Sequence, residues 1–254
     1  MNWTAILLAG SRPGRDPFAA EFGTDLKALI PIEGEPMVRR PARALLQSES
    51  IGSVIVMSQQ PERIADALRQ DPRTTVRASR GSIAETMLEL CEEQTLQWPL
   101  FVTTGDHALL ESATIDEFLT AANGADLAIG VVERANMLRR FPDARRTWLK
   151  FRGGAFTGAN LFALGSPKVA DAIRLWSGGE QGRKKGWRLI SLFGPAILAG
   201  VGLRLLSVDQ VAAHVGKKLG LSVKIVRLSD PLAGVDVDKM ADHQLAEAII
   251  AGRM

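Results

Sequence analysis

The sequence predicts an α/β fold in which helices cover both faces of a mainly parallel sheet, as three α/β/α layers. Short apolar runs typical of buried strands alternate along the chain with segments of helical periodicity. No internal repeat, low-complexity tract or clear linker interrupts this alternation. A chain of 254 residues can form one large α/β domain or two small ones. We therefore expect a single domain over residues 1–254.

The first expected strand is the apolar run Ala5–Ala9, which stops at Gly10. A loop rich in glycine, proline and arginine follows, and a second apolar run, Ala28–Ile32, comes directly after Lys27. The loop is not a Walker A sequence, because no Gly-Lys-Ser/Thr follows, and it is not a dinucleotide-binding fingerprint, because the G-x-G-x-x-G spacing is missing.

This glycine-rich loop is a candidate phosphate site. Gly10 and Gly14 allow tight turns and close approach of the backbone to a ligand. Backbone N–H groups in such a loop can form an anion-binding concavity, to which Arg12, Arg15 and Lys27 would add positive charge. The combination suits a nucleoside triphosphate, and a solvated turn is the alternative.

Helices and strands alternate in the next part of the chain. A helix is expected over residues 36–47, where Pro36 suits a first turn and Pro41 should kink or shorten the helix. Strands are expected over residues 53–57 and 74–77, with a helix over 61–69 between them.

The segment RASRGSIAETM marks the start of another helix, after Gly81. Ser82 and Glu85 have the spacing of a capping box. A strand end, a glycine and a helix N-terminus place backbone donors where a base or a phosphate could bind. An ordinary, well-capped turn is the alternative.

Asp106 follows the next expected strand, residues 99–103, and precedes a helix that begins near residue 112. Open α/β sheets bind ligands at the carboxyl ends of their strands, and a carboxylate there can hold Mg²⁺. A surface turn is the alternative. His107 could orient Asp106, touch a substrate or be incidental.

A basic stretch follows the strand expected over residues 126–132. Its cations are Arg134, Arg139, Arg140, Arg145, Arg146, Lys150 and Arg152. They indicate either a solvated face or a lobe that binds a phosphorylated substrate. A further strand is expected over residues 160–164, and a helix over 166–176.

A second basic group stands before a long apolar run. The group comprises Arg183, Lys184, Lys185 and Arg188. It suggests a solvated helix start, a phosphate contact or contact with an anionic membrane. The run over residues 189–201 is interrupted by Gly194 and Pro195 and is too short to span a bilayer. It is a candidate for a packed helix pair, a homodimer face or a lipid contact.

The last elements continue the alternation. Strands are expected over residues 203–207 and 222–228, with a helix over 208–219 between them and another helix after Asp238.

Composition excludes several classes of protein. The net charge is +3 and the basic residues are scattered, which does not favour nucleic-acid binding. A single cysteine, Cys91, excludes an internal disulfide and lies in an apolar helical pattern typical of a core thiol. We expect a cytoplasmic protein without a transmembrane segment.

Together, LLAGSRPGR and KALIPIEGEPM resemble the opening signature of the GT-A-like NTP transferase superfamily, which includes MobA-like and sugar-phosphate nucleotidyltransferases. The matching positions of the second half are Lys27, Leu29, Ile32, Gly34, Pro36 and Met37. Two features depart from the signature: Ser11 replaces a usual glycine, and residues 16–25 lengthen the loop. The segment VDVDKMADHQLA resembles the closing signature of the same superfamily.

The resemblance implies a Rossmann-like, GT-A-like fold and a set of site residues. The nucleotide-binding positions would be Ala9, Gly10, Ser11, Gly14, Gly81 and Ser82. Arg12, Arg15 and Lys27 would be catalytic, holding the phosphates, while Asp106 and Asp236 would hold Mg²⁺. Asp238 and Asp242 would cap and charge the last helix. An acceptor-binding insertion over residues 133–200 would include Gly158 and Asn160.

The function that the resemblance implies is Mg²⁺-dependent nucleotidyl transfer from an NTP to a small phosphorylated acceptor, with release of pyrophosphate. Two alternatives stay open. One is a glycosyltransferase that uses an NDP-sugar, although the Asp-x-Asp motif expected there is missing from the Thr-Gly-Asp-His turn. The other is a non-catalytic nucleotide-binding or regulatory protein. The sequence fixes neither the base nor the acceptor.

Overall fold

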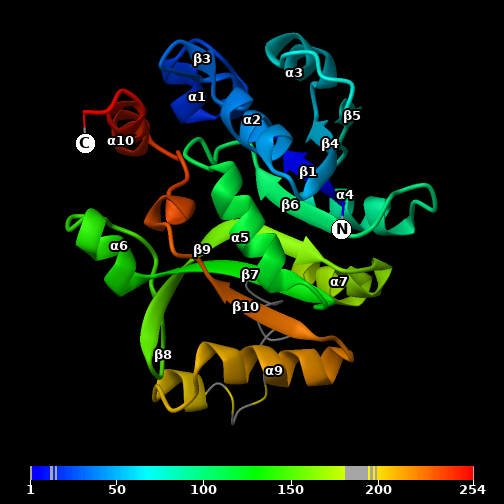
Figure 1. Ribbon diagram of the computed structural model, residues 1–254, viewed down its shortest axis with the longest axis vertical. Coiled ribbons are helices and arrows are strands. Elements are labelled where there is room, and N and C mark those ends of the chain that lie inside the picture. Colours follow the sequence, from blue (N-terminus) through cyan, green and yellow to red (C-terminus); the bar gives the residue numbers. More distant parts are fainter. Residues whose placement is uncertain are drawn as a thin grey trace.

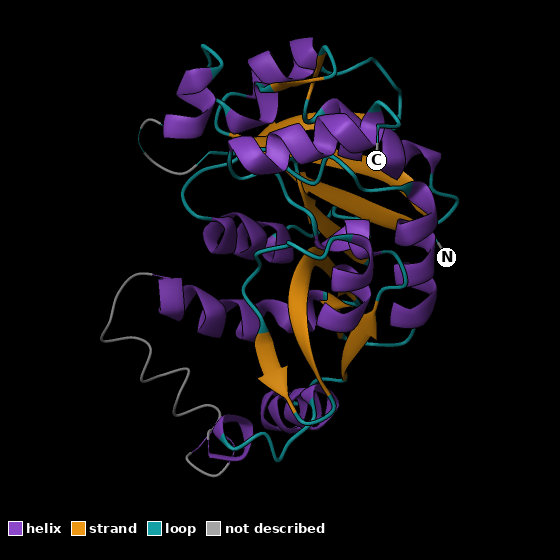
Figure 2. Cartoon of the chain, turned by 90° about the vertical axis from the view of Figure 1, so that its left-hand side faces the viewer, coloured by secondary structure: helices purple, strands orange, loops and turns teal. Residues whose placement is uncertain are grey.

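The computed structural model describes residues 2–11, 14, 16–180, 194, 197 and 199–253. Its main feature is an eight-stranded sheet in the order β10-β7-β9-β6-β1-β4-β5, with β8 paired to β9 (Figures 1 and 2). The strands are β1 (Trp3–Leu8), β4 (Ile51–Ser58), β5 (Thr74–Ala78), β6 (Leu100–Thr104), β7 (Leu127–Glu133), β8 (Leu149–Phe151), β9 (Gly154–Leu164) and β10 (Val223–Arg227).

The sheet is mixed but mainly parallel, which confirms the predicted fold class. Strands β1, β4, β5 and β6 are mutually parallel neighbours, and β10 is parallel to β7. Strand β9 runs antiparallel to β6, β7 and β8. A separate two-stranded hairpin joins β2 (Pro31–Ile32) to β3 (Glu35–Pro36).

Helices cover both faces of the sheet. They are α1 (Pro17–Glu21), α2 (Arg39–Gln47), α3 (Pro61–Ala67), α4 (Ile83–Glu92), α5 (Ser112–Ala122), α6 (Arg134–Arg140), α7 (Ala170–Glu180), α9 (Val208–Leu219) and α10 (Met240–Ile250), with short 3-10 helices η1 (Lys27–Leu29), η2 (Pro167–Val169) and η3 (Pro231–Gly234). Neighbouring residues of β1 belong to different hydrophobic cores, one on each face of the sheet. Leu7 lies in the same core as Phe118 of α5, whereas Ile6 lies in the same core as Leu90 of α4. This alternation produces the three layers.

The C-terminal segment returns to the N-terminal part of the chain. Helix α10 lies beside the β2–β3 hairpin (Figure 1), where His243 Nε2 is 2.7 Å from the Pro31 carbonyl oxygen. Just before α10, the Val237 N–H donates to the Asp106 carbonyl oxygen at 3.0 Å. These contacts bring residues 236–242 to the carboxyl end of β6, although more than a hundred residues separate the two in the chain.

Several element boundaries differ from the sequence prediction. Helix α2 begins at Arg39 rather than at residue 36, which places Pro41 in the first turn, where its missing N–H needs no partner within the helix. The helix is therefore shorter than predicted. Helices α1 and α6 and strand β8 were not predicted, and β9 begins at Gly154, six residues before the predicted start.

The strand predicted over residues 203–207 is wrong. This segment is the turn after a helical end, with hydrogen bonds from Leu203 N–H to Ala199 O and from Leu205 N–H to Gly200 O. Leu203 and Leu205 are 70% and 59% exposed, so the apolar pattern that suggested a buried strand belongs to a surface.

The whole second basic group and most of its apolar run cannot be compared with the prediction. Residues 181–193, 195, 196 and 198 lie outside the described residues. Within the described part of the chain, no helix has both the length and the apolar character needed to cross a membrane.

Candidate active site

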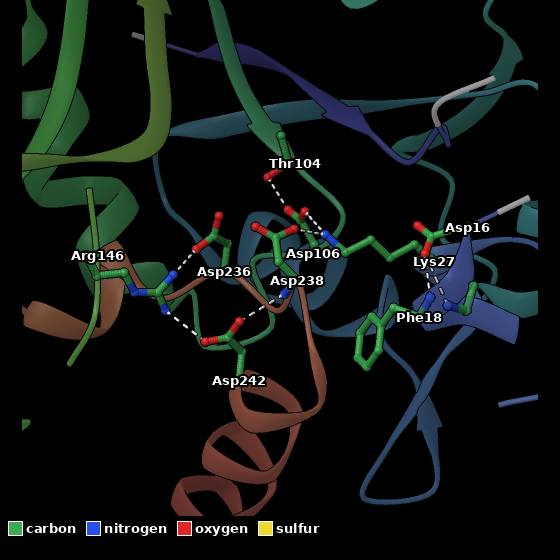
Figure 3. Close-up of polar contacts among 10 residues, drawn as sticks. Asp16, Phe18, Lys27, Thr104, Asp106, Arg146, Asp236, Asp238 and Asp242 are labelled. Atoms are coloured by element: carbon green, nitrogen blue, oxygen red, sulfur yellow. Dashed lines mark hydrogen bonds and ion pairs between the residues drawn. The ribbon is translucent and has the colours of Figure 1, made fainter. Parts of the chain in front are cut away.

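The candidate site lies at the carboxyl ends of β1 and β6, the edge where open α/β sheets place ligands. The two strand ends are held closely together, because the Gly105 N–H donates to Leu8 O at 2.8 Å. A Cβ on Gly105 would lie 3.3 Å from the Ala9 Cα, so a glycine suits this crossing. Asp106 follows directly, and its side chain points toward Lys27 (Figure 3).

Asp106 is held from both sides. Lys27 Nζ lies 2.6 Å from Asp106 Oδ2, and the Thr104 hydroxyl donates to Asp106 Oδ1 at 2.6 Å (Figure 3). Lys27 also donates to Asp238. Burial opposes the charge of Lys27, but Asp106 and Asp238 outweigh it and raise the lysine pKa above 10.5. Lys27 is therefore a fixed cation between two carboxylates.

A second cation, Arg146, contacts two further carboxylates of the site. We call Asp106, Asp236, Asp238 and Asp242 together the carboxylate group. The Arg146 guanidinium donates to Asp236 and lies 3.5 Å from Asp242 Oδ1 (Figure 3). Burial raises the pKa of Asp236, and the negative charges of Asp238 and Asp106 raise it further, against the effect of Arg146. Arg146 thus does not fully offset the effects of burial and of the neighbouring carboxylates on Asp236.

The structure brings the two predicted metal ligands, Asp106 and Asp236, into one electrostatic group, and it also pairs each with a cation. Within the described residues, no three or more His, Cys, Asp or Glu side chains are arranged so that they alone could hold a metal ion. The carboxylates are thus not a preformed protein cage for a metal.

A pocket of about 390 Å³ opens beside this group. Gly158 and Asn160 of β9 line it together with Asp236, so the predicted acceptor positions do lie next to a predicted metal ligand. A Cβ on Gly158 would meet open space, and Asn160 has a positive φ of 51°. Arg145 and Lys239 add positive charge to the lining.

The predicted nucleotide loop follows β1. Gly10 is exposed, the Ser11 N–H donates to Gln59 Oε1 at 2.9 Å, and Gly14 has a φ of 102°, which favours glycine. Arg12 and Arg15 lie outside the described residues. The extension over residues 16–25 contains a helix: Asp16 accepts hydrogen bonds from the Phe18 and Ala19 N–H groups and so caps α1 (Figure 3).

The capping box predicted at α4 is confirmed. Ser82 Oγ accepts from the Glu85 N–H at 3.2 Å, and Glu85 Oε2 accepts from the Ser82 N–H at 2.6 Å. Gly81 precedes it with a φ of 76°, and a Cβ there would lie 2.2 Å from Glu85 Oε2. Gly81 and Ser82 therefore have a structural role, and base recognition by them stays a prediction.

His107, next to Asp106, is buried. It is 1% exposed, and the backbone of Leu232 and Ala233 in η3 lies close to its ring. Burial lowers the His107 pKa to about 4, against the opposing effect of Asp106 and of the Leu232 and Ala233 backbone. It is therefore neutral at physiological pH, and a role for it at the substrate stays a prediction.

Sequence reasoning missed three members of the site. Asp238 was expected to cap α10, but its carboxylate accepts from Lys27, while Asp242 accepts from the Asp238 N–H at 3.4 Å. Thr104 stands in the Thr-Gly-Asp-His turn, only two positions before Asp106. This short spacing could have predicted that the Thr104 hydroxyl contacts the Asp106 carboxylate. Arg146 is one of seven cations in its stretch, and no local pattern distinguishes it from the others.

Comparison with known proteins agrees with this geometry. The MobA-like NTP transferase domain matches residues 5–191, nearly three quarters of the chain. The chain belongs to this family. A search of curated proteins with the sequence found no match.

Solved structures show the same fold. A hypothetical transferase from Thermus thermophilus superposes with a TM-score of 0.81 and 30% identity, over 96% of this chain and 100% of that one. The 4-diphosphocytidyl-2C-methyl-D-erythritol synthase of Anaerococcus prevotii gives 0.62 and 11%, over 98% and 96%. A CMP:2-keto-3-deoxy-manno-octonic acid synthetase in complex with CTP gives 0.62 and 12%, over 100% of both chains. The resemblance seen in the sequence is confirmed, and the fold is that of nucleotidyltransferases.

Proposed function

We propose that the protein is a Mg²⁺-dependent nucleotidyltransferase that joins an NTP to a small phosphorylated acceptor and releases pyrophosphate. The observation that carries the proposal is the group of Lys27, Asp106, Asp236 and Asp238 at the carboxyl edge of the sheet. Membership of an NTP transferase family supports the reaction class. We treat residues 1–254 as one domain with an acceptor-binding insertion at about 133–200.

The donor set fits a magnesium ion. Mg²⁺ is commonly bound by one or two carboxylates, with waters and substrate phosphates completing its shell, so a full protein cage is not needed. Burial raises the pKa of Asp236, and the negative charges of Asp238 and Asp106 raise it further; a divalent cation would relieve that repulsion. Asp106 and Asp236 would hold the ion, which supplies charge neutralisation to the phosphates.

The chain's own residues would position and neutralise the reactants. Lys27, together with Arg12 and Arg15, would hold the triphosphate above the β1 loop. The acceptor would lie in the pocket beside Gly158 and Asn160. Its phosphate oxygen attacks the α-phosphorus in line, forming a new P–O bond as the bond to pyrophosphate breaks. A phosphate monoester is already anionic, so no general base is required, and catalysis rests on positioning and charge.

One observation favours a second candidate, a nucleotide-binding protein without catalysis. Both carboxylate oxygens of Asp106 already have partners, Lys27 and Thr104. If these contacts persist with nucleotide bound, Asp106 would have little capacity for a metal, and the nucleotide would bind without Mg²⁺.

A thermal-shift panel of ATP, CTP, GTP and UTP, with and without Mg²⁺, separates the two candidates. A ligand at about 100 times its Kd stabilises the folded state by roughly 2.7 kcal/mol. Transferase function predicts a shift with one NTP that requires Mg²⁺, is lost in Asp106→Asn and is kept in the control Asp66→Asn, an exposed position on α3. A shift that ignores Mg²⁺ and the Asp106 substitution supports the binding protein, and no shift with any NTP contradicts both.

A further inference from the structure

A second pocket, of about 550 Å³, lies outside the carboxylate group, on the β8–β9 hairpin. Its lining includes the cations Arg134, Lys150 and Arg204 and the aromatic rings of Trp148 and Phe151. The Arg134 guanidinium lies 6.0 Å from the Trp148 ring centroid. Among the described lining residues, every charged side chain is basic, and the Glu133 carboxylate lies next to the lining residue Gly154.

Exposed leucines are the chain neighbours of two of these cations, Lys150 and Arg204. Leu149, Leu203 and Leu205 are 58%, 70% and 59% exposed, the three highest values among the large apolar side chains of the described residues. Leu149 adjoins Lys150 on β8, and Leu203 and Leu205 flank Arg204. We call these five residues the leucine patch.

Two distant parts of the chain form the leucine patch, and they meet at the basic pocket. Arg204 lines the same pocket as Lys150, and the Arg152 N–H donates to Leu206 O at 2.8 Å, which fixes the turn against the hairpin. Figure 1 shows the segment before α9 beside β8, at the end of the molecule remote from α1 and α3.

We propose that the leucine patch docks on the surface of an anionic phospholipid bilayer. Three leucines would enter the boundary between headgroups and acyl chains, while Arg134, Lys150 and Arg204 bind lipid phosphates. Peripheral proteins bind membranes through this combination of apolar area and basic charge. A soluble anion would fill the pocket but leave the leucines exposed to water, so a lipid surface fits both features.

Docking would also orient the molecule. Thr147 and Thr157 line the pocket of about 390 Å³ beside the carboxylate group. Trp148 and Ala155, which lie one and two positions from these threonines, line the basic pocket of about 550 Å³. The hairpin thus connects the two pockets. The docking proposal does not depend on nucleotidyl transfer, and it is tested without measuring activity.

Co-sedimentation of the full-length protein with vesicles tests the proposal. We expect binding to vesicles of equal parts phosphatidylglycerol and phosphatidylcholine, weakened by added salt, and little binding to phosphatidylcholine alone. Lys150→Glu should weaken binding roughly tenfold or more, because each basic residue near an anionic membrane contributes about 1 kcal/mol. Leu203→Ser with Leu205→Ser should weaken it by about tenfold or more, because leucine burial is lost.

Matched controls alter similar side chains elsewhere. Arg69→Glu, beyond α3, and Ile83→Ser, on α4, are both at exposed positions and should bind vesicles like the wild type. Thermal melting confirms that each variant is folded. The proposal is overturned if the wild type ignores anionic vesicles, if inorganic phosphate binds while vesicles do not, or if light scattering shows a dimer that the leucine substitutions dissociate.

Discussion

Replacing Lys27 with methionine tests whether this lysine neutralises the carboxylate group. Lys27 and Asp106 are 15% and 20% exposed, with Nζ and Oδ2 2.6 Å apart. Removing one partner of a buried pair costs about 3–5 kcal/mol. These side chains retain some solvent contact, and Asp238 is 59% exposed, so we expect a loss of roughly 2–3 kcal/mol. For a chain of this size that corresponds to a melting temperature lower by about 5–10 °C.

Urea unfolding followed by tryptophan fluorescence measures this loss. Mg²⁺ should stabilise Lys27→Met more than the wild type, because the variant's carboxylates lack their cation. Lys168→Met, at an exposed position on η2, is the control and should change the free energy of unfolding by less than about 0.5 kcal/mol. The reasoning is refuted if Lys27→Met is as stable as the control, or if Mg²⁺ stabilises it no more than the wild type.

Three further results are expected. Arg146→Met should lower the free energy of unfolding by about 2–3 kcal/mol in urea, because Asp236 and Asp242 lose a largely buried partner; an unchanged midpoint would contradict this. Ser82→Ala should cost about 1 kcal/mol in the same assay, through loss of the α4 cap, and a neutral result would show that the cap is dispensable. Burial raises the Cys91 pKa from 9 to about 11, so at pH 8 the folded thiol should react with a disulfide reagent at least about 100-fold more slowly than the unfolded one, and equal rates would disprove its burial.

The local parts of the fold and site could be predicted from the sequence. The turn that carries Asp106 directly follows strand β6, and Ser82 and Glu85 are only three positions apart, so short sequence patterns were sufficient to predict both features. Contacts between residues that are distant in the chain could not be predicted from such short patterns. Asp238 meets Lys27 across 211 positions, and its place before α10 made capping the simpler interpretation.

Arg146 and the turn around Leu203 show two other limits. Arg146 differs from the other cations of its stretch by its contacts with Asp236 and Asp242. These contacts depend on how the segment before β8 packs against the C-terminal segment, which the sequence does not show. Leu203 and Leu205 follow the alternating pattern of a strand, but they lie on a surface, and an apolar pattern alone does not indicate what will cover it.

The central claim is that the carboxylate group supports Mg²⁺-dependent transfer from an NTP. Pyrophosphate release, measured for each NTP with a deproteinised metabolite extract as the source of acceptor, tests it most directly. We predict release with one NTP that requires both extract and Mg²⁺, stops on chelation and is lost in Asp236→Asn but not in Asp66→Asn. Release that continues in Asp236→Asn, or no release with any NTP, would contradict the account.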